Sequence, residues 1–223
     1  MSDQTFLFAD LAGFTALTEH HGDLEAAELA VGFSEACREL LDRHGATEVK
    51  TIGDAMLVRV ECPASAIELG VCIATDLGER HGFPMIRVGM HTGSAVERAG
   101  DWFGAAVNLA ARVSAEASGG QVLLTEHTSA VAGRLEGIEL RERGKRTLRN
   151  VKEPVVLLEA LHEGVKRENE LPVDPVCRMA VDPEHAAGSL RHDGRLFHFC
   201  SLDCAGDFAA EPGRYAPKPE ANR

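Results

Sequence analysis

The chain has 223 residues, 44% of them hydrophobic, and carries 23 basic against 35 acidic side chains, for a net charge of −12. This length allows one medium-sized domain and one small domain. The acidic balance argues against non-specific binding to nucleic acid or to a membrane surface, so an anionic substrate would need a local basic pocket.

The chain begins MSDQTFLFADLAGF, with an early acidic residue and an apolar stretch too short for a signal peptide. No run approaches about 18 apolar residues, so we expect no membrane-spanning helix and a cytoplasmic location. In that reducing compartment cysteines serve as core residues or metal ligands more often than as disulfides. We expect Cys37, Cys62 and Cys72 to be buried as small apolar side chains.

Strand-like and helix-like patterns alternate along the chain. Alternating or continuous apolar runs predict strands at residues 5–12, 46–52, 55–61, 85–93, 121–125, 138–143 and 155–161. Helical spacing of apolar residues predicts helices at residues 23–43, 63–80, 104–117 and 126–132. The dipeptide Gly53-Asp54 marks a tight hairpin turn, so some strand pairs are antiparallel. The pattern favours an α+β fold of ferredoxin-like arrangement, a mixed sheet with helices on one face.

A charged segment without periodicity, residues 163–172, predicts a linker. It divides the chain into a domain at 1–162 and a small unit at 173–216, followed by a tail at 217–223. A unit of this size is near the limit at which an apolar core alone is sufficient, so a bound metal would help it to fold. The charged linker is expected to couple the two parts only weakly.

Two aspartates each end a strand-like run at a turn. Asp10 closes FLFAD and Asp54 lies in TIGDAM, and carboxylates that converge in this way can hold divalent metal. Asn108 and Arg112 are four residues apart and share one face of a predicted helix. Together, two carboxylates, an amide and a guanidinium are suited to a site for phosphoryl transfer. The alternatives are that the aspartates are ordinary turn residues and that Asn108 and Arg112 are an exposed polar pair.

Four motifs occur in a characteristic order: FxDLxGFT, VKTIGD, RVGMHTG and GDWFGxxVNLAARV. Through them, about residues 4–162 resemble the catalytic domain of class III nucleotidyl cyclases. The resemblance implies the same ferredoxin-like fold. It also implies that the ribose 3′-hydroxyl attacks the α-phosphorus of a nucleoside triphosphate and pyrophosphate leaves, with two Mg²⁺ or Mn²⁺ ions in each active site.

The resemblance assigns roles to particular residues. Asp10, Asp54 and the carbonyl of Leu11 match the metal ligands of the family. Asn108 and Arg112 match the pair that orients the ribose and stabilises the transition state.

Lys50 and Asp101 match the residues that read the base. A lysine that donates and an aspartate that accepts suit adenine, whereas guanine-specific members carry glutamate and a small residue. Arg87 and Lys145, or its neighbour Arg146, match residues that contact phosphates. For Arg87 the alternative is a cross-strand salt bridge.

The family places the two halves of each site on different subunits, which implies a homodimer with two equivalent sites. The substrate implied is ATP, and no nucleic-acid or membrane partner is expected. Three alternatives stay open: a nucleotide-binding signalling module without turnover, a guanylate cyclase, and a metal carrier or sensor that uses the cyclase fold as a scaffold.

The segment at 173–216 contains DPVCRM, then FCS and a further cysteine, and resembles a YHS domain. It departs from the usual pattern at Arg178 and at Phe197-His198. The resemblance implies a small metal-binding type of α+β module that regulates the cyclase domain or senses a metal.

The three cysteines of this segment, Cys177, Cys200 and Cys204, suit a soft ion such as Zn²⁺ or Cu⁺. His198 is a candidate fourth ligand. The alternative is that the cysteines are small core residues. The aromatic side chains of the segment are expected to build its core: Phe197, Phe199, Phe208 and Tyr215.

Overall fold

The computed structural model describes residues 3–77, 83–164, 172–179 and 181–216. Most of the predicted linker, the whole predicted tail and the last three residues of the helix predicted over 63–80 lie outside the described residues. No helix in the described part is long and apolar enough to cross a membrane.

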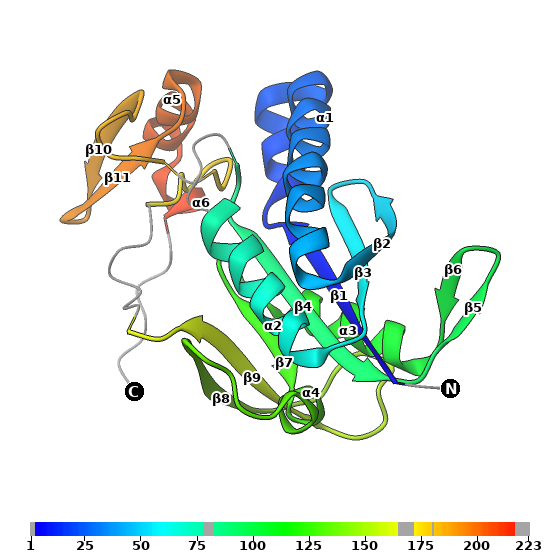
Figure 1. Ribbon diagram of the computed structural model, residues 1–223. Coiled ribbons are helices and arrows are strands. Elements are labelled where there is room, and N and C mark those ends of the chain that lie inside the picture. Colours follow the sequence, from blue (N-terminus) through cyan, green and yellow to red (C-terminus); the bar gives the residue numbers. More distant parts are fainter. Residues whose placement is uncertain (1–2, 78–82, 165–171, 180, 217–223) are drawn as a thin grey trace.

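A seven-stranded sheet forms the centre of the first domain (Figure 1). Its strands are β1 (Gln4–Leu11), β2 (Ala46–Ile52), β3 (Ala55–Val60), β4 (Ile86–Gly93), β7 (Val122–Thr125), β8 (Ile138–Arg146) and β9 (Val155–His162). The helices are α1 (Phe14–Leu41), α2 (Pro63–Cys72), α3 (Ala105–Glu116) and α4 (Glu126–Ala132), with short helical turns at Asp42–His44 and Ile73–Leu77.

The strand order is β2-β3-β1-β4-β7-β9-β8. Each neighbouring pair among β2, β3, β1 and β4 is antiparallel, and these strands arise from a β1-α1-β2-β3-α2-β4 sequence, which is the ferredoxin-like arrangement. The parallel pair β4–β7 makes the sheet mixed. The predicted fold class is confirmed, including the hairpin at Gly53-Asp54, where Ile52 pairs with Ala55.

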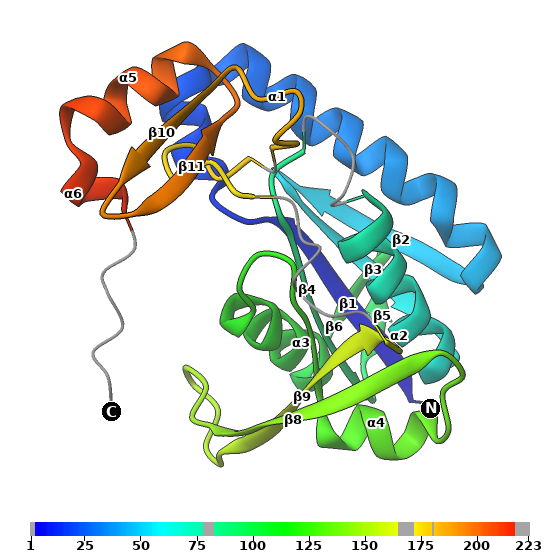
Figure 2. The ribbon, with the colours of Figure 1, turned by 90° about the vertical axis from the view of Figure 1, so that its left-hand side faces the viewer.

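Helices cover both faces of the sheet, so the prediction of helices on one face is wrong. Leu7 and Ala9 of β1 pack in the cluster that contains α1 and α2, whereas Phe6 packs with Ala106 and Ala110 of α3. Figure 2 shows α3 on the side of the sheet opposite α2. The apolar run of β1 is continuous because both of its faces are buried, and such a run does not say how many faces are covered.

Helix α1 begins at Phe14, nine residues before the start predicted at Asp23. It is broken at Gly22, whose φ of 82° and ψ of 165° are not helical. The prediction found only the segment after the break. The earlier segment has one deeply buried apolar residue, Leu17, and that side chain faces the second domain instead of the sheet.

The structure also contains a small hairpin of β5 (Val96–Arg98) and β6 (Asp101–Phe103), where the sequence patterns predict no strand. Its three-residue strands are too short to show a period. Among the cysteines of this domain, Cys37 is buried as predicted, and Cys72 is partly buried. The prediction is wrong for Cys62, which is exposed at the N-terminal end of α2.

The second domain contains the hairpin β10 (Gly188–His192) and β11 (Arg195–Phe199), then α5 (Leu202–Ala210) and α6 (Pro212–Tyr215). Its aromatic core is confirmed. The Phe208 ring lies 4.9 Å from that of Phe197 and 5.3 Å from that of Phe199, measured between centroids. Tyr215 packs against the same cluster.

The two domains share a core, contrary to the expectation of weak coupling. Leu17 and Ala26 of α1 are buried in the same cluster as the core residues of the second domain. Pro84 pairs with Met179 through the backbone, and His20 Nδ1 lies 3.1 Å from a carboxylate oxygen of Asp207. Both ribbon views show the module beside the N-terminal half of α1 (Figures 1 and 2). A module of this size gains buried area by packing on that helix.

Candidate functional site

Two carboxylates meet at the end of β1. Asp10 pairs in register with Ala55 of β3 on one side and Arg87 of β4 on the other, which places it next to Asp54 in the hairpin turn. Burial, together with hydrogen bonding to and repulsion by Asp10, raises the pKa of Asp54 to about 7. Leu11 follows directly in the same strand. The structure brings the three predicted metal ligands together.

Arg87 donates from Nε to Asp10 Oδ2 at 2.8 Å. This is the cross-strand salt bridge that was the alternative to phosphate contact. The guanidinium neutralises one of the two carboxylates, and a divalent cation would relieve the repulsion that remains between them.

Lys50 and Asp101 form an ion pair of 2.6 Å between Nζ and Oδ2. The strands β2 and β6 carry them, so residues far apart in the sequence meet here. The other carboxylate oxygen of Asp101 accepts the N–H of Trp102 at 2.8 Å. The hydrogen bond from Lys50 is the main cause of the lowered pKa of Asp101.

This ion pair lies at the edge of a hollow of about 410 Å³. Lys50, Trp102 and Asn108 line it together with apolar side chains such as Phe8 and Phe103. Apolar walls with a few polar groups are typical of a pocket for a flat organic ring.

A second hollow of about 440 Å³ adjoins α3. Asn108 and Arg112 lie one helical turn apart and line it, with Arg149 and Lys152 of the β8–β9 connection opposite them. The excess of positive side chains suits phosphate groups. Asn108 lines both hollows, so the two lie next to each other on α3.

Lys145 lies exposed on β8 and is not among the residues that line either hollow. Arg149 and Lys152 are the basic residues found there, and the sequence reasoning missed them. The signal was the run RERGKRTLRNVK, which offers several basic residues, but its register is ambiguous without the fold. Asp10 and Asp54 also line neither hollow.

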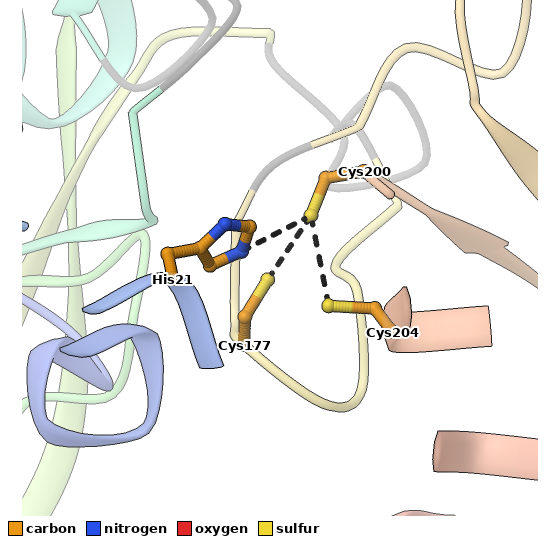
Figure 3. A group of neighbouring side chains, drawn as sticks. All are labelled: His21, Cys177, Cys200 and Cys204. Carbon is orange, nitrogen blue, oxygen red and sulfur yellow. Dashed lines mark hydrogen bonds between the residues drawn. The ribbon is translucent and has the colours of Figure 1, made fainter. Parts of the chain in front are cut away.

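The three cysteines of the second domain converge with a histidine of α1 (Figure 3). The Sγ atoms of Cys177 and Cys204 lie 3.3 and 3.9 Å from Sγ of Cys200, and Nε2 of His21 lies 3.6 Å from it. His198, the predicted fourth ligand, is not in this group, because its side chain lies 3.0 Å from the Ser189 hydroxyl on the hairpin. His21 was missed because nothing local in the sequence connects it to the cysteines.

A buried carboxylate organises the thiol loops. Asp174 accepts the N–H of Val176 at 2.8 Å and the N–H of Cys200 at 2.9 Å. Cys204 lies in the first turn of α5, where its N–H donates to the Ser201 hydroxyl at 3.1 Å. Backbone contacts hold the cysteines in place without using their sulfur atoms.

A ferredoxin-like sheet with paired carboxylates and a basic hollow defines a class of nucleotide-handling domains. The chain belongs to the family of adenylate and guanylate cyclase catalytic domains, whose family model matches residues 1–159. The model of the YHS domain matches residues 173–218.

Curated proteins that are similar in sequence to this chain include adenylate cyclases. The chain is 35% identical over 156 residues to the pH-sensitive adenylate cyclase MT1302 of Mycobacterium tuberculosis, covering 69% of this chain and 39% of that protein. It is 35% identical over 117 residues to an adenylate cyclase of Streptomyces coelicolor, covering 52% and 31%. The chain therefore spans only about a third of the length of these relatives.

A further relative is a copper-transporting P-type ATPase of Rhizobium leguminosarum bv. viciae, 44% identical over 54 residues, covering 24% of this chain and 6% of that protein. Among solved structures, a monomeric adenylate cyclase of Trypanosoma brucei has a TM-score of 0.62 at 24% identity, covering 72% of this chain and 90% of that one. That similarity shows the fold alone.

Proposed function

We propose that this protein is an adenylate cyclase, which converts ATP to 3′,5′-cyclic AMP and pyrophosphate. The observation that carries the proposal is the 2.6 Å pair of Lys50 and Asp101 at a hollow that shares the lining residue Asn108 with the hollow lined by Arg112. A donor and an acceptor side by side match the N1 and N6 edge of adenine.

From the same arrangement we infer the roles of the remaining residues. Asn108 orients the ribose, and Arg112 stabilises the charge that develops at the α-phosphorus. Arg149 and Lys152 hold the outer phosphates, in place of the predicted Lys145. Arg87 holds the carboxylate of Asp10 in position through its hydrogen bond.

The residues present fit divalent cations. Asp10, Asp54 and the Leu11 carbonyl offer only oxygen, the donor that Mg²⁺ and Mn²⁺ prefer, and Asp10 lies close enough to Asp54 to contribute to the raised pKa of Asp54. Two ions held here would activate the 3′-hydroxyl and neutralise the triphosphate.

We further infer a homodimer. The carboxylate pair and the Asn108–Arg112 hollows are separate groups within one chain, and each would complete the other across a two-fold axis. Ile52 and Phe103 are 53% and 55% exposed beside the first hollow, and a partner subunit would cover them.

For the second domain we propose a soft-metal site at the three cysteines, with a metal-sensing or regulatory role. The thiols are free and close together, which suits Zn²⁺ or Cu⁺. The copper-transporting relative supports the choice of copper, and a histidine close to the thiols supports zinc. Free thiols also agree with a cytoplasmic location.

The decisive experiment measures turnover of ATP and of GTP by the full chain with Mg²⁺ and with Mn²⁺. The expected result is cyclic AMP, formed well in excess of cyclic GTP. Cyclic GTP as the main product would favour a guanylate cyclase, and nucleotide binding without either product would favour a non-catalytic signalling module.

A further inference from the structure

We propose that His21 of the cyclase domain is the fourth ligand of a zinc site whose other ligands are Cys177, Cys200 and Cys204. The ion would then join the YHS module to helix α1. This inference rests on the proposed soft-metal site and does not depend on the cyclase reaction.

The distances within the group match a tetrahedral site. For bonds of about 2.3 Å to sulfur and about 2.05 Å to nitrogen, the edges of a tetrahedron are about 3.8 Å between sulfurs and about 3.6 Å between sulfur and nitrogen. Around the Cys200 sulfur the three observed distances are 3.3, 3.9 and 3.6 Å. All four ligand atoms lie within 4.8 Å of one another.

The orientation of the histidine is that of a metal ligand. Nε2 faces the thiols, while Nδ1 lies 3.2 Å from a carboxylate oxygen of Glu25, four residues further along the chain. Metal-binding histidines usually donate their other ring N–H to a carboxylate or carbonyl, which fixes the tautomer and raises the basicity of the ligating nitrogen. Three thiolates and one imidazole are a common set for structural zinc.

The helix is shaped to present this side chain. Gly22 directly follows His21 and has backbone angles that only glycine adopts readily. The break ends the first segment of α1 at His21, and the side chain is 12% exposed where it meets the module.

The site is also close to the carboxylate pair along the chain. Asp10 is followed by Leu11, and three residues later α1 begins at Phe14. Ala12 is held to Met85 by a 2.8 Å backbone hydrogen bond, and the adjoining Pro84 pairs with Met179 of the module. Zinc that fixes α1 against the module would therefore restrain the segment that leads out of the metal-binding end of β1.

The test uses the full-length chain with one equivalent of Zn²⁺ in excess Mg²⁺, so that the carboxylate pair does not compete for zinc. X-ray absorption at the zinc edge should give three sulfur ligands and one imidazole. H21A should lose the imidazole scattering and bind zinc at least about 10-fold more weakly in competition with a chelator. The matched control is H198A, which removes a histidine of the module that lies outside the thiol group and should behave like the wild type.

Hydrogen exchange gives a second readout that a folding defect would not imitate. Zinc should slow exchange over residues 14–26 in the wild type and in H198A but not in H21A, while the sheet strands exchange alike in all three. The role of His21 would be overturned if the wild type binds zinc through sulfur alone. It would also be overturned if H21A keeps the zinc affinity and the imidazole scattering of the wild type. A wild-type chain that takes up no zinc, or C200S that binds it normally, would overturn the thiol site as well, and neither result would bear on turnover of ATP.

Discussion

Asp54 illustrates how one side chain can make stability depend on pH. Its pKa of about 7 in the fold, against an ordinary value of 3.8, is caused by burial and by the neighbouring Asp10. An acid whose pKa is raised on folding binds its proton more tightly in the folded state than in the unfolded state. The metal-free protein should therefore lose stability as the pH rises from about 4 to about 7.

Urea unfolding of the metal-free chain at several pH values between 4.5 and 7.5 measures this effect. Asp54→Asn should flatten the decline, because the amide does not titrate, whereas the control Glu97→Gln, on the exposed strand β5, should keep the wild-type slope. Equal slopes in wild type and Asp54→Asn would contradict the prediction.

The proposed recognition of the base can also be tested at single residues. Lys50→Glu replaces the 2.6 Å ion pair with Asp101 by two like charges at the edge of the hollow. Turnover of ATP should fall by roughly 10- to 100-fold, because a charged hydrogen bond is lost and repulsion is added. Combining it with Asp101→Ser should shift the ratio of kcat/KM values toward GTP.

The control for base recognition is Arg38→Ala. It breaks another ion pair to β2, the 2.7 Å contact with Glu48, outside both hollows. It should leave the ratio of ATP to GTP turnover unchanged. A double variant at Lys50 and Asp101 with the wild-type preference would show that other residues select the base.

At the scale of elements, helix α3 depends on one glycine in β4. A Cβ on Gly89 would lie 2.0 Å from the backbone nitrogen of Ser114, so the helix and the strand approach too closely for any side chain. Gly89→Ala should lower the free energy of unfolding by about 1–3 kcal/mol or more. It should also reduce turnover, because α3 carries Asn108 and Arg112.

Gly206→Ala is the matched control. Gly206 lies in helix α5, and a Cβ at this position would meet nothing within 4 Å, so alanine should leave stability unchanged or raise it by about 0.5–1 kcal/mol. Urea unfolding of both variants is the measurement. If Gly89→Ala has the same free energy of unfolding as the wild type, α3 can move away from β4 without loss of stability.

Sequence patterns identified most elements because their signals are local. The Gly53-Asp54 turn and the apolar periods of β1, β3 and the second part of α1 depend on residues close in the chain. The patterns failed where burial is decided by a distant partner. The first turns of α1 have little apolar periodicity because their buried residue faces the module, and the hairpin β5–β6 is too short to have a period.

The residues of the candidate sites also fall into two groups, those that local sequence motifs identify and those that only the fold reveals. Six residues belong to the sequence motifs and could be identified without the structure: Asp10, Asp54, Lys50, Asp101, Asn108 and Arg112. Arg149 and Lys152 lie in a basic run in which only the path of the β8–β9 connection decides which side chains reach α3. His21 joins the cysteines solely through packing of two domains, and no spacing in the sequence encodes that contact.

At the scale of the whole molecule, the proposed dimer predicts complementation. Asp54→Ala and Arg112→Ala should each be inactive, because every site loses one of its halves. Mixed together, they form heterodimers with one intact site, so roughly a quarter of wild-type activity should return after random exchange of subunits. Cyclic AMP formation in the mixture is the measurement.

The control mixture combines Asp54→Ala with Asp10→Ala. Both changes damage the same half of the site, so activity should stay absent. No recovery in the first mixture, with heterodimers shown to form by mass spectrometry, would contradict a site shared between subunits.

The shared core has a practical consequence for work on the catalytic domain by itself. Leu17 and Ala26 are 0% and 2% exposed in a cluster whose other buried members all come from the YHS module. A chain truncated after residue 162 would retain the proposed catalytic residues, but the apolar surface of α1 around Leu17 and Ala26 would be exposed to solvent. Aggregation or altered turnover of this truncated chain would then result from the exposed apolar surface and not from the loss of regulation by the module. Cys200→Ser would remove one proposed metal ligand while the module still covers Leu17 and Ala26.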